Sequence, residues 1–150
     1  MSKDPNSSVK VSKACIVLFA VIMAAVMVTA PKLFSLLIEK RIDYLSGKLP
    51  YFLVSTYTAC VPAAFALKAM YSLLGNIENG KVFIDENVVH IDRVSVCCIA
   101  AGFICLVSCL YYLPFVMPGV ARGFVGLILK VVKNVFRQAV ELQKDSDYTI

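Results

Sequence analysis

The sequence ACIVLFAVIMAAVMVTA, residues 14–30, decides the fold because it contains no charged side chain. Lys13 precedes this run and Lys32 follows shortly after it. The hydrocarbon core of a bilayer is about 30 Å thick, and a helix of about 20 apolar residues crosses it. Irregular backbone cannot cross, since lipid offers no hydrogen-bond partners to its N–H and C=O groups. We therefore predict a transmembrane helix near residues 14–30.

This first apolar run also has some features of a secretory signal peptide. It follows a basic start and ends in Val28-Thr29-Ala30, which resembles a cleavage site. However, the run is longer than the apolar core of a usual signal peptide, and Pro31 would follow the cut directly. We expect the segment to be retained as a membrane span.

Two further uncharged runs, residues 49–67 and 94–121, are each at least 18 residues long. They predict membrane spans near 51–74 and 94–113, with tyrosines at their ends at the level of the lipid headgroups. The composition agrees, because 59% of the residues are hydrophobic and only 17% are charged. Soluble domains average about 45–50% apolar and about 25% charged residues. This composition excludes a disordered chain, and the length of 150 residues excludes a large enzyme with a separate substrate domain.

The last apolar segment, near 115–136, differs from the other three because it is amphipathic. Arg122, Lys130, Lys133 and Arg137 recur at helical spacing and form a basic stripe. Such a helix can lie flat on anionic lipid, or it can span with its long basic side chains reaching toward the headgroups or the bundle interior. The sequence therefore leaves two architectures to compare.

The distribution of basic residues favours four spans. With the N-terminus inside, ten Lys and Arg residues lie on the cytoplasmic side and five lie outside, in line with the positive-inside rule. We therefore predict an all-α integral membrane four-helix bundle in the cell membrane. Residues 1–150 form one membrane domain, with both termini, the loop 75–93 and the tail 137–150 in the cytoplasm. The alternative architecture has three spans and an interfacial amphipathic helix.

The six cysteines all fall within predicted spans, which argues against a disulfide framework and against a zinc site. Cys98, Gly102, Cys105 and Cys109 follow helical spacing and predict a strip of small residues where another helix packs. We expect the protein to hold no metal ion and no cofactor.

The loop 75–93 carries turn and capping signals. Asn79-Gly80 predicts a turn, and Asp85 is a candidate N-cap for the helix that leads into the third span. His90 is the one histidine, and with no evident cysteine or serine partner it is interpreted as a solvated loop residue.

Two motifs lie on either side of the third span. The first is Gly80-x-x-Phe83-x-x-x-Asn87, followed by Ile91 and Arg93. The second is the end of the chain, and its candidate residues are Phe136, Glu141, Leu142, Asp147, Thr149 and Ile150.

These two motifs, in this order and at this separation, resemble those of the domain-of-unknown-function family 2975. The resemblance runs from the first span to the last residue. It implies a small bacterial integral membrane protein with four spans and no assigned reaction. It also implies a gene that often neighbours one for a small helix-turn-helix regulator, which suggests that the protein is a membrane partner of that regulator.

The predicted spans 14–30, 51–74 and 94–113 contain no acidic residue, which argues against an enzyme. We expect a non-enzymatic protein whose partners are the lipid bilayer and a cytoplasmic regulator. We expect no direct binding of nucleic acid, and the sequence is compatible with a homo-oligomer. One alternative is a small transporter that uses Arg122 as a membrane-embedded charge. Another is a peptide-immunity or envelope-stress protein that meets a peptide through an outer loop at 32–48.

Overall fold

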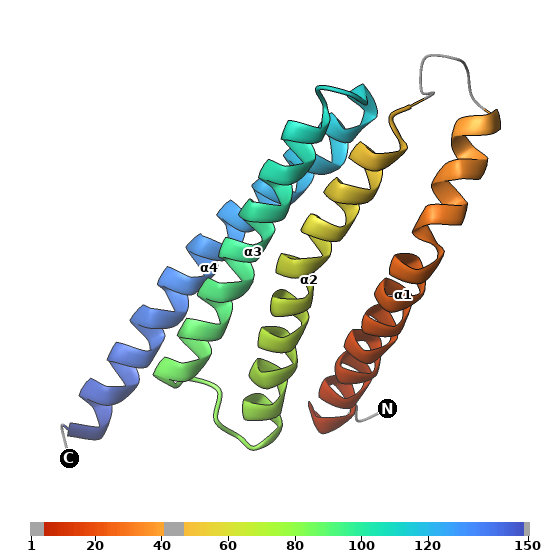
Figure 1. The fold of residues 1–150 in the computed structure, drawn as a ribbon. Coiled ribbons are helices and arrows are strands. Elements are labelled where there is room, and N and C mark those ends of the chain that lie inside the picture. The colour runs from red at the N-terminus through yellow and green to blue at the C-terminus, as the bar shows by residue number, and fades with distance from the viewer. Residues whose placement is uncertain (1–4, 41–46, 149–150) are drawn as a thin grey trace.

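The structure is a computed structural model that describes residues 5–40 and 47–148. Four long helices run up and down in chain order (Figure 1), which confirms the all-α prediction with four helices packed together. A 3-10 turn, η2, precedes the last helix. The elements are α1 Pro5–Lys40, α2 Leu49–Glu78, α3 Asp85–Ser108, η2 Leu113–Phe115 and α4 Val116–Tyr148.

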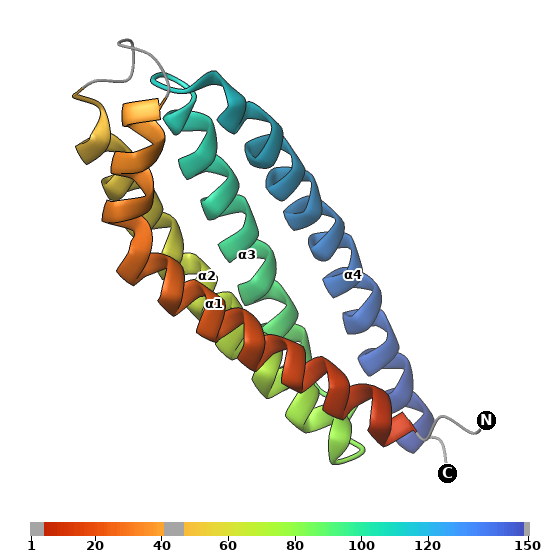
Figure 2. The same cartoon turned by 90° about the vertical axis from the view of Figure 1, so that its right-hand side faces the viewer.

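Each helix packs mainly on the helix that is next to it in the chain. The contact between α3 and α4 is the most extensive, followed by α2 with α3 and then α1 with α2. Helix α1 lies at one edge and makes at most marginal contact with α3 and α4 (Figures 1 and 2). The start of α1, the α2–α3 loop and the end of α4 lie together at one end of the bundle, which we call the terminal end.

All four helices are long and apolar enough to cross a membrane. In the most apolar window of each helix, between 6% and 39% of the residues are buried inside the protein, so large apolar surfaces face outward. Surfaces of that kind are covered by lipid in a membrane protein. The chain is therefore a multi-pass membrane protein with four candidate spans, and α4 packs lengthwise on α3 as a span does.

The helices extend beyond the predicted spans. Helix α1 continues from the first span to Lys40, so part of the predicted outer loop 32–48 is helical. Residues 41–46 of that loop lie outside the described residues. At the terminal end, α2 continues to Glu78 and α3 begins at Asp85, so the non-helical part of the predicted loop is limited to residues 79–84.

Glycines hold the α3–α4 contact close. A Cβ atom added to Gly102 would lie 2.9 Å from the backbone nitrogen of Gly123, and one added to Gly126 would lie 2.6 Å from Cγ1 of Ile99. The hydroxyl of Ser95, which is fully buried, donates a hydrogen bond to the carbonyl oxygen of Gly126 at 2.7 Å. Small residues and cross-helix hydrogen bonds of this kind are what hold helices together in lipid.

The predicted small-residue strip is part of this contact. Gly102 and Cys105 are buried where α3 meets α4, whereas Cys98 and Cys109 are half-buried. All six cysteines are free thiols.

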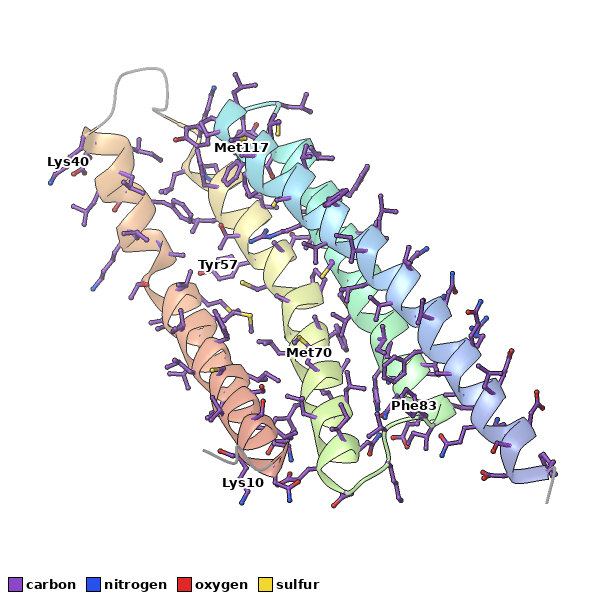
Figure 3. All side chains as sticks on the ribbon, turned by 180° about the vertical axis from the view of Figure 1, so that it is seen from behind. Lys10, Lys40, Tyr57, Met70, Phe83 and Met117 are labelled. Carbon is purple, nitrogen blue, oxygen red and sulfur yellow. The ribbon has the colours of Figure 1, made fainter. Side chains whose placement is uncertain are left out.

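A proline and a tyrosine join α1 to α2. Pro31 lies inside α1 and has no N–H group, so the carbonyl of Met27 lacks its usual helical partner. The hydroxyl of Tyr57 in α2 donates to that carbonyl oxygen at 2.9 Å, and Figure 3 shows Tyr57 directed toward α1. The α1–α2 contact therefore supplies a hydrogen bond that lipid could not.

Aromatic rings close the end of the bundle opposite the terminal end. Phe52 is 6% exposed and lies at their centre, with its ring 5.1 Å from that of Tyr111. The hydroxyl groups of Ser55 and Tyr111 share a hydrogen bond. The other rings of this cluster are those of Phe34, Tyr51, Tyr112 and Phe115.

The close α3–α4 contact predicts a difference between two glycine substitutions. The Cβ atom of Gly102→Ala would meet backbone atoms of α4, whereas that of Gly123→Ala would meet nothing within 4 Å. We expect Gly102→Ala to lower the free energy of unfolding by about 1–3 kcal/mol, as overpacking does. Gly123→Ala should be neutral or raise it by up to about 1 kcal/mol, because alanine is the better helix former. Unfolding of the helices in mixed detergent micelles measures both, and equal effects would contradict the packing described.

Candidate functional site

The loop between α2 and α3 is a tight turn that requires a glycine. Gly80 has a φ of 76°, in the left-handed region that residues with a Cβ atom rarely adopt. Its N–H donates to the carbonyl of Ile77 at 3.0 Å, and the N–H of Lys81 donates to the carbonyl of Asn76 at 2.9 Å. These bonds satisfy the last carbonyl groups of α2, so Gly80 of the first motif has a structural role.

Asn87 fastens this loop to α3. Its side chain is fully buried, and its Nδ2 atom donates to the carbonyl oxygens of Lys81 at 2.8 Å and Val82 at 2.7 Å. Its Oδ1 atom accepts a hydrogen bond from Nδ2 of Asn76 in α2 at 2.9 Å. One buried amide therefore joins the end of α2, the loop and the first turn of α3.

The candidate N-cap at Asp85 is wrong by one position. Ile84 has the extended backbone of an N-cap residue and makes no capping hydrogen bond with its side chain. Asp85 lies in the first turn of α3, where a negative charge is favoured by the helix dipole. It is free there to accept a hydrogen bond from Nζ of Lys144 in α4 at 2.6 Å.

The structure brings the two sequence motifs together. The rings of Phe83, in the loop, and Phe136, in α4, lie 5.3 Å apart. On either side of Phe136 along α4, Lys133 pairs with Asp92 at 2.9 Å and Lys144 pairs with Asp85. The Lys144–Asp85 pair is exposed, and such pairs contribute only about 0–1 kcal/mol. The aromatic contact and the half-buried Lys133–Asp92 pair therefore hold the segments together more strongly.

The tail of α4 is anchored rather than free. Val140 is 2% exposed and is among the most completely buried side chains of the described residues. Helix α4 continues through Tyr148, well beyond the predicted span 115–136. At about 1.5 Å per residue its 33 residues measure about 50 Å, which exceeds the hydrocarbon thickness of about 30 Å. Helix α4 is therefore longer than the hydrocarbon core is thick, and its end lies beside the start of α3, where Lys144 pairs with Asp85.

Other residues of the two motifs face outward. The side chains of Phe83 and Leu142 are 46% and 69% exposed at this end. We call the surface formed by the loop 79–84, the first turns of α3 and residues 133–148 the loop–tail surface. Arg93, Glu141 and Asp147 are exposed on or beside it, and Thr149 and Ile150 lie outside the described residues.

The interpretation of His90 as a solvated loop residue is wrong. His90 lies within α3 and is 7% exposed. Its Nε2 atom lies 3.4 Å from Oε1 of Glu86, but neither ring nitrogen makes a hydrogen bond. The spacing of Asn87, His90, Ile91 and Val94 could have revealed this, because these buried residues recur at the interval of one helix face.

Arg122 is far from the loop–tail surface. It lies in the second turn of α4, near the aromatic end of the bundle, and donates from Nη1 to the sulfur of Cys105 at 3.0 Å. Within residues 5–40 and 47–148, no group of three or more His, Cys, Asp or Glu side chains is placed to hold a metal ion.

The bonds of Asn87 predict how the loop opens. Asn87→Ala removes three hydrogen bonds and leaves two carbonyl groups of the loop without their partner. We expect it to lower the free energy of unfolding by about 1–3 kcal/mol. It should also speed trypsin cleavage after Lys81. The rate of this cleavage is measured by gel electrophoresis of samples digested in detergent. Asn79→Ala changes an exposed residue of the same turn and is the control; cleavage at equal rates in the two variants would contradict this assignment.

Comparison with known proteins identifies a family for the chain. No curated protein and no solved structure matches the chain. A family model described as "Protein of unknown function (DUF2975)" matches residues 12–150, which is nearly the whole chain and includes both motifs, the last three candidate spans and most of the first. The chain therefore belongs to the DUF2975 family.

Proposed function

We propose that this protein is a non-enzymatic membrane docking protein that binds a soluble cytoplasmic protein through its loop–tail surface. The contact between Phe83 and Phe136 carries this proposal, because it joins two motifs from distant parts of the chain into one surface. That surface stands at the end of a helix that is longer than the membrane is thick.

The chemistry of the surface suits protein recognition. Exposed apolar side chains, Phe83 and Leu142, lie among charged residues of both signs. Protein interfaces combine apolar side chains with a polar rim. The buried anchors, Asn87 and Val140, hold the backbone in place, so little ordering would be needed when a partner binds.

The partner that we propose is a small helix-turn-helix regulator. This choice rests on the gene neighbourhood that the family resemblance implies. The terminal end is the proposed cytoplasmic side, because the positive-inside rule places the more basic ends of the spans there. A regulator held at this surface would be kept at the membrane and away from other cytoplasmic sites.

The proposed orientation predicts the location of the C-terminus. A green fluorescent protein fused after Ile150 should fold and fluoresce in the cytoplasm of a bacterial host. Alkaline phosphatase fused at the same position should be inactive, because it needs the oxidising exterior. The opposite pair of results would place the loop–tail surface outside the cell and would overturn the proposal.

The proposed docking predicts that a charge introduced into the loop–tail surface weakens binding of the regulator. A small helix-turn-helix regulator encoded beside a gene of this family is co-expressed with the full chain, and the fraction of the regulator that sediments with membranes is measured. Leu142→Glu places a charge on an exposed apolar position of that surface and should lower that fraction about tenfold, as expected when an apolar contact worth about 1.4 kcal/mol is lost.

Leu110→Glu is the matched control, because Leu110 is 89% exposed at the aromatic end of the bundle. It should leave the sedimenting fraction unchanged. Equal recovery of the regulator with the wild-type chain and with Leu142→Glu would remove this surface from the proposal. If the regulator does not sediment with membranes that contain the wild-type chain, the proposal that it is the partner is wrong.

A further inference from the structure

A groove lies between the two outer helices. Because α1 packs mainly on α2, and α4 mainly on α3, the space between α1 and α4 is not closed by direct helix packing. A groove of about 560 Å³ occupies this space, and α2 and α3 line most of it. Figure 3 looks onto this face and labels Met70, a residue of α2 that lines the groove. The volume is within the range of about 300–1,000 Å³ that is typical of ligand sites.

The two ends of the groove differ in polarity. Near the aromatic end it is lined by Ser55, Ser108 and Arg122. Toward the terminal end its lining is apolar and extends to Met70 in α2 and Phe19 in α1. The fifteen helical steps from Ser55 to Met70 correspond to about 22 Å, which exceeds the half-thickness of the hydrocarbon core, about 15 Å. The groove is thus long enough for an acyl chain of one membrane leaflet.

Arg122 supplies the charge of the groove. No aspartate or glutamate is among the residues that line it, and no acidic side chain of the described residues pairs with Arg122. Its hydrogen bond goes to the sulfur of Cys105, which is a weak acceptor. An arginine within a membrane span is costly unless an anion compensates it, and its planar group matches two oxygens of a phosphate.

The depth of Arg122 suits a lipid headgroup. Arg122 lies six residues after the start of α4, or about 9 Å along the helix from the aromatic end. Tyr51 and Tyr111 at that end are residues that prefer the headgroup level. A long arginine side chain at this depth reaches the phosphate layer, while the apolar part of the groove runs into the hydrocarbon.

We propose that this groove binds one anionic phospholipid, with its phosphate at Arg122 and an acyl chain along α2 and α3. The opening between α1 and α4 gives a lipid lateral access from the bilayer. A free phosphate would match Arg122 but would leave the apolar lining uncovered, so the occupant is the lipid. This site is at the other end of the bundle from the loop–tail surface and does not rest on the proposed function.

The test measures lipid binding by native mass spectrometry of the full chain in mild detergent. Phosphatidylglycerol and phosphatidylcholine with the same acyl chains are the probes. We expect the wild-type chain to bind one phosphatidylglycerol about tenfold more tightly than phosphatidylcholine. Arg122→Gln should bring this preference to within about twofold, and Lys130→Gln, on the same helix but outside the groove, should keep it. Equal binding of both lipids by the wild-type chain, or a preference kept in Arg122→Gln, would overturn the proposal.

A second pair of variants tests the groove without changing a charge. Ala63 lines the groove and its neighbour Ala64 is exposed outside it. Ala63→Phe should fill the groove and abolish tight binding of phosphatidylglycerol, whereas Ala64→Phe should bind as the wild-type chain does. Circular dichroism checks that each variant is helical. Stabilisation by inorganic phosphate equal to that by phosphatidylglycerol would indicate an anion site without a lipid chain. A dimer that Ala63→Phe alone dissociates would indicate a second copy of the chain in the groove, and either result would overturn the proposal.

Discussion

The structure depends on one constraint, which is that lipid forms no hydrogen bonds with the backbone. Helices satisfy this constraint along almost all of their length, because each N–H group bonds to a carbonyl four residues earlier. Pro31 breaks the pattern in α1, and the hydroxyl of Tyr57 takes the place of the missing donor at the Met27 carbonyl. The same constraint explains why serine hydroxyls in the apolar helices bond to carbonyl oxygens, as Ser95 does with Gly126. Polar atoms inside this bundle therefore also serve as links between helices.

A second property follows from the lipid environment. Apolar side chains gain little by leaving lipid for a protein interior, so helices in a membrane associate through close contact and hydrogen bonds. The α3–α4 pair meets both conditions, since Gly102 and Gly126 allow the backbones to approach and Ser95 bonds across. Helix α1 has neither glycine nor serine at a comparable contact and is the most exposed of the four. The bundle is thus firmest at α3–α4, which is also the pair that supports the loop–tail surface.

Much of the fold could be predicted from the sequence, because charge-free runs and helix length are direct consequences of membrane thickness. The small-residue strip could also be predicted, because the helical spacing of Gly102 and Cys105 places both on one helix face. The ends of the helices could be predicted less well than the spans. Outside the hydrocarbon a helix continues as long as its neighbours support it, as α4 does to Tyr148. The burial of His90 agrees with the spacing of Asn87, Ile91 and Val94 on the same helix face, but recognising this spacing requires that the helix begin at Asp85, inside the segment that the sequence assigns to a loop. The groove could not be predicted, because it arises from α1 and α4 staying apart, and spacing along the chain carries no sign of that.

Helix α4 is one uninterrupted rod of 33 residues that joins the two ends of the molecule. Arg122 projects from its second turn, while Phe136 and Leu142 project from its far end. A rod that turns about its axis turns all of its side chains by the same angle. Any rotation of α4 relative to α3 would therefore reorient Arg122 and the α4 part of the loop–tail surface together. Helix α4 thus connects the two ends of the molecule mechanically.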